Sequence, residues 1–207
     1  MAKAGFRIID AEPHFFEPHD LWERNLEEPF RSLTKTTSTA PGRIGEGGLR
    51  PEVVGLEVPK VEANPLVQRR ALRRVPQVDH MAKVTARPEP DVFIEGFDVE
   101  GIDVGVLMPT YAMGMVRFDD LDPAHAVAIC RVYNDYAAGF VRSDPARFKF
   151  WAWVPPQDAT LAAAEARRCV EELGAIGVAM TGGAVDGHLL SDDFFEPLWD
   201  AMDELRV

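Results

Sequence analysis

Two side chains near the start of the sequence, Glu12 and His14, have the types and the spacing of metal ligands. They follow an apolar run, Phe6 to Ile9, which predicts a buried strand. Because side chains alternate along an extended chain, positions 12 and 14 point the same way and can present a carboxylate and an imidazole to one metal ion. Glu-x-His is also a short and common string, and a polar turn enforced by Pro13 explains it equally. The motif alone leaves both interpretations open.

The residues around this motif resemble a known family. Residues 8–26, which read IIDAEPHFFEPHDLWERNL, are similar to the N-terminus of the ACMSD-like amidohydrolases, a branch of the metal-dependent hydrolases and decarboxylases. The resemblance resumes at Gly96 and runs to the last residue through three blocks, at 96–110, 131–158 and 185–205. Residues 8–26 and the span from Gly96 to the last residue together make up well over half of the chain.

The resemblance implies a role for each residue of the motif. The family's first barrel strand ends in Asp-x-His-x-His, so Asp10 takes the Asp position, Glu12 the first His position and His14 the second. A carboxylate in place of the first His favours harder cations, manganese or iron, although zinc accepts both ligand types. The implied cofactor is therefore a divalent metal ion (Zn, Mn or Fe). The family's third ligand, a His after strand five, and its acid/base Asp after strand eight have no position in this sequence.

Strands and helices alternate along the rest of the chain. Strands are expected at 104–108, 148–154 and 176–180, and helices at 93–100, 123–141, 158–173 and 197–205. Asp122 and Asp158 are the expected N-caps, and Gly101 and Gly174 are expected to end the helices before them. Buried strands that alternate with helices predict a parallel sheet covered on its outer face, and four such units are half of a (β/α)8 barrel. We therefore expect an α/β fold, strands one to four of a TIM-like barrel with their helices, plus a long irregular insertion.

The domain organisation expected is a first strand with the metal motif and an entry loop (1–30), a basic insertion or arm (31–92), and the second to fourth βα units (93–207). One helix is predicted within the arm, at 64–75. An open half barrel would expose two sheet edges and its apolar interior. A second polypeptide that supplies strands five to eight in a hetero-oligomer is expected to cover them; a truncated product, or two copies closing one barrel, are the alternatives.

Function in a parallel barrel gathers at the C-terminal ends of the strands. Besides the metal pair, that rule selects candidate substrate-binding residues, namely Phe15, Thr110, Tyr111, Trp153, Met180 and His188. One face of each strand packs on the helix layer, so Trp151 or Trp153 is expected in the core. An exposed loop position is the alternative for His188.

Composition excludes several classes of function. The net charge is −12, yet residues 31–90 carry eleven Lys/Arg against six Asp/Glu. The acidic remainder argues against nucleic-acid binding, because phosphates require a positive surface. No run is long enough to span a membrane and no secretory signal is recognised, so a cytoplasmic protein is expected. Cys130 and Cys169 are expected to be buried free thiols.

Three functions fit these observations. The first is half of a split metal-dependent enzyme that hydrolyses a C–C or C–N bond, or decarboxylates a carboxylated, aromatic or apolar small molecule, with its acid/base on the partner chain. The second is a non-haem iron oxygenase, with one iron or two, on the same barrel, favoured by the carboxylate of Glu12. The third is a non-catalytic structural or regulatory subunit.

Overall fold

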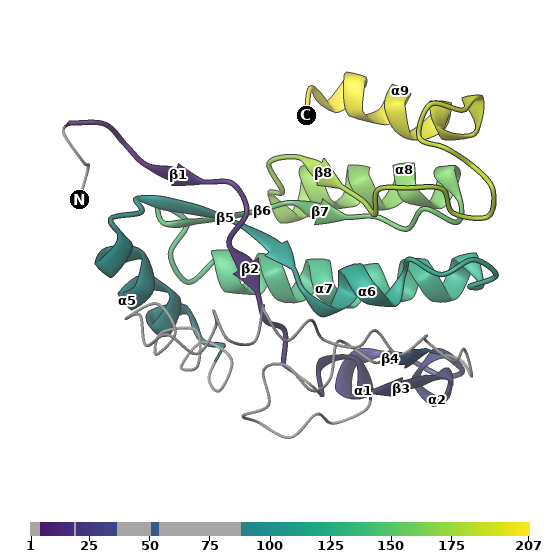
Figure 1. Ribbon diagram of the computed structural model, residues 1–207, viewed down its shortest axis with the longest axis horizontal. Coiled ribbons are helices and arrows are strands. Elements are labelled where there is room, and N and C mark those ends of the chain that lie inside the picture. Colours follow the sequence, from purple (N-terminus) through teal and green to yellow (C-terminus); the bar gives the residue numbers. More distant parts are fainter. Residues whose placement is uncertain (1–4, 19, 37–50, 54–87) are drawn as a thin grey trace, which may run out of the picture.

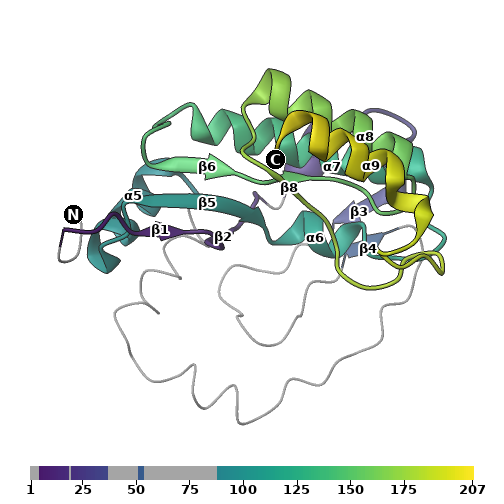
Figure 2. The same ribbon diagram turned by 90° about the horizontal axis from the view of Figure 1, so that it is seen from above.

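The computed structural model describes residues 5–18, 20–36, 51–53 and 88–207 (Figure 1, Figure 2). Its strands are β1 (Ile9–Asp10), β2 (His14–Phe15), β3 (Thr34–Thr36), β4 (Pro51–Val53), β5 (Val104–Pro109), β6 (Phe148–Phe150), β7 (Ala152–Trp153) and β8 (Val178–Ala179). Its α-helices are α1 (Leu21–Asn25), α2 (Phe30–Leu33), α5 (Pro90–Glu100), α6 (Tyr111–Met115), α7 (Pro123–Val141), α8 (Ala159–Arg168) and α9 (Glu196–Leu205). A π-helical turn, η1 (Cys169–Leu173), continues α8, and a 3-10 turn, η2 (Asp193–Phe195), precedes α9.

The strands form the first half of a parallel barrel. β1 and β2 are two parts of one strand, and both pair in parallel with β5, with Ile9 opposite Val104 and His14 opposite Met108. β6 pairs with β5 and β7 pairs with β8, again in parallel. The strand order therefore follows the sequence, as predicted for half of a (β/α)8 barrel.

The helices form a layer on one side of these strands. α7, α8 and α9 lie side by side there in Figure 2, and α5 packs its phenylalanines into the same layer. The Phe97 ring lies 5.7 Å from the Phe148 ring of β6, which lies 5.2 Å from Phe140 of α7. Gly105 lacks a side chain where Phe97 crosses β5, and a Cβ there would overlap the Phe97 ring. The core thus lies between the strands and the helices, as in other α/β folds.

Local signals in the sequence mark several of these helix ends, although α5 begins at Pro90 and not at residue 93 as predicted. Asp122 and Asp158 cap α7 and α8, and their carboxylates accept the backbone N–H groups of His125 and Leu161 at 2.9 and 2.8 Å. Gly101 and Gly174 adopt the left-handed conformation just after α5 and η1, as expected for helix C-terminal glycines. Cys130 and Cys169 are buried free thiols, as predicted.

The prediction of a buried strand from Phe6 to Ile9 is wrong. The strand lies at residues 9–10 and 14–15 instead, and Phe6 and Ile9 are 73% and 59% exposed. The physical reason is that, among the described residues, this strand pairs only with β5, so it forms an edge with nothing on its other side. Apolar composition predicted burial here without regard to this position.

The predicted basic arm is described only in part. Its described residues include most of α2, a short antiparallel pair between β3 and β4, and the first turn of α5. The helix predicted at 64–75 lies outside the described residues, and the division at 1–30, 31–92 and 93–207 stays a prediction. Within the described part of the chain, no helix has the length and apolar character needed to cross a membrane.

Candidate metal site at the end of the first strand

Glu12 of the metal motif lies on a short irregular segment, residues 11–13, between β1 and β2. Three hydrogen bonds hold it, from Glu12 N to Asp10 Oδ1 (3.0 Å), from Met108 N to Pro13 O (3.3 Å) and from Trp151 Nε1 to Ala11 O (3.0 Å). Glu12 is exposed, whereas these three bonds hold its own N–H group and the carbonyl groups of its two neighbours, Ala11 and Pro13. This combination suits a metal ligand, which must be accessible and still hold its direction.

His14 lies on β2 with its side chain exposed. Its Nδ1 lies 3.4 Å from the Oγ1 of Thr110, a long hydrogen bond, and Thr110 follows β5 directly. A histidine that binds a metal through one ring nitrogen is usually held by a hydrogen bond at the other. Thr110 therefore leaves Nε2 of His14 as the nitrogen that can bind a cation.

A buried carboxylate, Glu17, lies beneath the same strand ends. It is 2% exposed, and its oxygens accept three consecutive backbone N–H groups, from Thr110 (3.2 Å), Tyr111 (2.9 Å) and Ala112 (3.1 Å). Burial raises the pKa of the Glu17 carboxyl to about 7, against the opposing effect of these N–H groups. Sequence reasoning missed Glu17, because Glu17-Pro18 has the composition of an exposed turn.

Trp151 spans the neighbouring strands from the gap between β6 and β7. Its Nε1–H reaches Ala11 of the first strand, and its ring lies against Gly177, just before β8. A Cβ at Gly177 would overlap this ring, with the Trp151 Cε3 only 2.7 Å away. Gly177 is therefore required for the close approach of the Trp151 ring, which lets Trp151 Nε1 bond to Ala11 in the segment 11–13.

Trp153, a predicted substrate-binding residue, lies in the core instead. It is 1% exposed within the main hydrophobic cluster, so it cannot line an open site. Asn134 of α7 holds its backbone, donating to the Trp153 O at 2.9 Å and accepting from the Trp153 N–H at 2.8 Å. Residues two positions apart share a face of a regular strand, but Trp151 lies in the break between β6 and β7, and Trp153 is the tryptophan that packs in the core.

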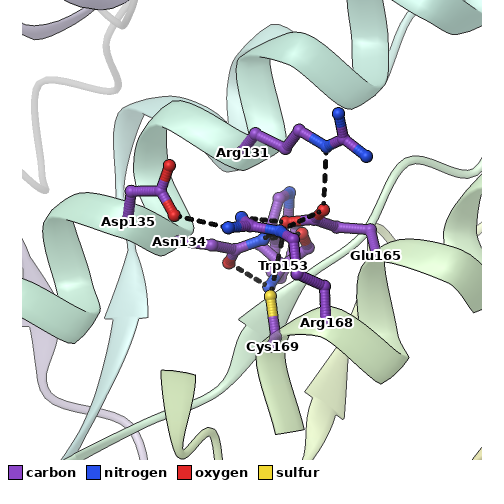
Figure 3. A network of polar contacts seen from close by, with 7 residues as sticks. All are labelled: Arg131, Asn134, Asp135, Trp153, Glu165, Arg168 and Cys169. Carbon is purple, nitrogen blue, oxygen red and sulfur yellow. Dashed lines mark hydrogen bonds and ion pairs between the residues drawn. The ribbon is translucent and has the colours of Figure 1, made fainter. Parts of the chain in front are cut away.

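Asn134 also belongs to a polar network between α7 and α8 (Figure 3). The Asn134 Nδ2 donates to Glu165, which is fully buried and pairs with Arg168 at 2.7 Å and with Arg131 at 3.0 Å. Burial alone would raise the pKa of the Glu165 carboxyl, but Arg168 and Asn134 lower it below its usual value. The network connects Trp153 at the end of β7 to helices α7 and α8, and it makes no contact with the metal motif.

The remaining candidate substrate-binding residues differ in where their side chains lie. Thr110 and Tyr111 lie beside the metal motif, and Tyr111 is half-buried with its ring edge-on to Phe16 at 6.3 Å. Met180 is partly buried and packs against the cluster between α8 and α9, because its side chain turns toward the helices. His188 is half-buried, not fully exposed, and stacks on Phe194 at 4.0 Å. The Phe15 side chain lies outside the described residues.

Comparison with known proteins identifies the family. A family profile described as "Amidohydrolase" matches residues 62–207, which is more than half of the chain. The chain belongs to the amidohydrolase family. The predicted resemblance to its ACMSD-like branch is thereby confirmed.

Curated relatives of this amidohydrolase chain include decarboxylases. Gamma-resorcylate decarboxylase of Polaromonas sp. (strain JS666) is 34% identical over 91 residues, which cover 42% of this chain and 28% of the relative. 2-Amino-3-carboxymuconate-6-semialdehyde decarboxylase of Dictyostelium discoideum is 29% identical over 117 residues, covering 56% and 32%. The chain therefore matches less than a third of the length of these relatives.

Solved structures confirm the half-barrel fold. 5-Carboxyvanillate decarboxylase of Novosphingobium aromaticivorans, solved with bound manganese, matches 98% of this chain at a TM-score of 0.60 and 23% identity. 2,6-Dihydroxybenzoate decarboxylase, solved with 2,6-dihydroxybenzoate, matches 97% at a TM-score of 0.59 and 22% identity. This chain spans 49% and 48% of those two chains, so the likeness covers about half of each.

The donor set fits a divalent cation only in part. Glu12 and His14 offer one carboxylate and one imidazole, which suit manganese, iron or zinc. Within residues 5–18, 20–36, 51–53 and 88–207, no group of three or more His, Cys, Asp and Glu side chains could hold a metal ion. The described part of this amidohydrolase chain thus offers two candidate ligands, and a metal site would need further ligands.

Proposed function

We propose that this chain is half of a metal-dependent decarboxylase for an aromatic or conjugated carboxylic acid, with Glu12 and His14 as two of the metal ligands. The observation that carries the proposal is the exposed Glu12–His14 pair at the end of the first strand, with Nδ1 of His14 directed to Thr110. The decarboxylase relatives support the substrate class, and the manganese bound in solved neighbours supports a divalent cation.

Decarboxylation places defined demands on such a site. The bond between the ring carbon and the carboxylate carbon breaks, carbon dioxide leaves, and the ring carbon takes a proton. A bound divalent cation would polarise the substrate oxygens and stabilise the negative charge that develops on them. Glu12 and His14 hold that cation in the proposal, and Thr110 orients the imidazole. Tyr111, which lies next to Thr110, is proposed to contact the substrate.

We propose further that a second polypeptide supplies strands five to eight, together with a His ligand and an acid/base Asp. Support comes from apolar side chains exposed at both edges of the half barrel. Phe6 and Ile9 are exposed along the first strand, and Ile176, which leads into β8, is 44% exposed. Further strands would bury these side chains and pair the open edges.

Purification from the native host without a chelator tests both parts of the proposal. We expect a stoichiometric second polypeptide, a divalent cation near one per complex, and release of carbon dioxide from 2,6-dihydroxybenzoate or a related acid. Iron with oxygen consumption would replace the decarboxylase by the oxygenase hypothesis. Activity unchanged by Glu12→Ala and His14→Ala would leave a non-catalytic subunit. A metal-free protein that is stable and inactive alone would contradict the proposal.

A further inference from the structure

The buried carboxylate of Glu17 has an unusual set of partners. The ion pairs among the described residues do not include it. It accepts instead the N–H groups of three consecutive residues, Thr110, Tyr111 and Ala112, which begin where β5 ends. Burial of this carboxylate has a desolvation cost that the three N–H groups offset only in part, and an apolar side chain of similar volume would avoid that cost. Packing alone does not account for a carboxylate here.

The geometry of the three hydrogen bonds indicates what Glu17 does. Two N–H groups converge on Oε2 and the third on Oε1, so one rigid group sets the direction of the backbone through the turn after β5. Thr110 is the first residue of that turn, and its Oγ1 is the atom that faces Nδ1 of His14. Because His14 pairs with Met108, two residues before Thr110, His14 and Thr110 lie at the same end of these paired strands.

We propose that Glu17 is a positioning residue for the metal site: it fixes Thr110 so that the Thr110 hydroxyl holds the His14 ring with Nε2 available to the cation. The inference rests on the proposed metal role of His14. Hydrogen-bond partners of metal-binding histidines typically contribute about 10–100-fold to metal affinity. Because the Thr110–His14 contact is long, we expect an effect near the lower end, about tenfold.

The test measures Mn²⁺ affinity of the assembled enzyme by titration for four proteins: wild type, Glu17→Gln, Thr110→Val and the double variant. A Gln amide offers one acceptor oxygen where the carboxylate offers two, and its NH2 group opposes an N–H donor. We expect each single variant to bind Mn²⁺ about tenfold more weakly. The double variant should bind no more weakly than Thr110→Val, because Glu17 acts through Thr110. Thr110→Ser, which keeps the hydroxyl, should restore most of the affinity.

Glu165→Gln is the matched control, because it also removes a buried, hydrogen-bonded carboxylate but lies in the helix layer. It should lower stability and leave Mn²⁺ affinity unchanged. If Glu17→Gln does not fold, Glu17→Asp replaces it, since the shorter side chain keeps the charge but cannot span all three N–H groups. An affinity unchanged in the Glu17 variant, effects that multiply in the double variant, or an equal loss in Glu165→Gln would each overturn the inference.

Two further variants separate this inference from the proposed function. Glu12→Ala and His14→Ala should abolish the Mn²⁺ site. If both retain wild-type affinity, the proposed metal site itself is wrong and the role of Glu17 falls with it. If both lose Mn²⁺ while the Glu17 and Thr110 variants keep it, only the positioning role is contradicted.

Discussion

The close contact between Trp151 and Gly177 predicts that Gly177→Ala destabilises the protein only while the indole is present. The new Cβ would overlap the Trp151 ring, and the backbone of Gly177 is not in the left-handed region, so the clash is the whole penalty. Overpacking of this kind typically destabilises a protein by about 1–3 kcal/mol. With Trp151→Ala, the same substitution instead reduces the entropy of the unfolded chain and should stabilise by about 0.4–1 kcal/mol.

A double-mutant cycle measures this coupling by urea unfolding of the wild type, the two single variants and the double variant. The difference between the two estimates above gives an interaction free energy of about 3 kcal/mol between positions 151 and 177. Gly139→Ala is the matched control, because its nearest new contact is an ordinary 3.5 Å to Arg142 Nη2. Its effect on the free energy of unfolding should be the same with and without the Trp151 indole. If Gly177→Ala changes the free energy of unfolding equally in both backgrounds, Trp151 does not lie where we place it.

Three other substitutions test the rest of the structure. Asp158→Ala removes the bond to Leu161 N and should lower the free energy of unfolding by about 1 kcal/mol, measured by thermal unfolding; no change would contradict the cap. Glu165→Ala leaves Arg168 and Asn134 without their acceptor and should destabilise by about 3 kcal/mol at pH 7. Because the pKa of Glu165 is lowered by folding, that difference should shrink as the pH falls below 4.5. For Glu17 the pH dependence has the opposite direction, because folding raises its pKa to about 7. As the pH rises from about 4.5 to 7, wild type should lose stability relative to Glu17→Gln by up to about 3 kcal/mol, measured by urea unfolding. A stability difference between wild type and Glu17→Gln that does not change with pH would refute the raised pKa of Glu17.

The sequence predicted the half barrel because its signals are local. Asp122, Asp158, Gly101 and Gly174 mark helix ends through contacts within one turn of the chain. Apolar runs alternating with helices then allow few topologies for a parallel sheet. These features do not depend on distant residues, so they can be recognised without knowledge of the tertiary structure.

What could not be predicted depends on residues far apart in the sequence. Glu17 is buried because three amides 93 to 95 positions away replace its water. Trp151 reaches Ala11, 140 residues away, while its neighbour Trp153 is enclosed by the core. Phe6 and Ile9 are exposed because of the place of their strand at a sheet edge. Composition and alternation carry no information on such contacts.

The measurement that tests the central claim most directly is carbon dioxide release by the purified assembled enzyme with Mn²⁺ and 2,6-dihydroxybenzoate. We predict activity in the wild type and in Glu23→Ala, which removes an exposed carboxylate of α1. We predict loss of activity to background in Glu12→Ala and in His14→Ala, together with loss of bound manganese. Full activity in both of these variants would contradict the assignment of a metal site to the end of the first strand.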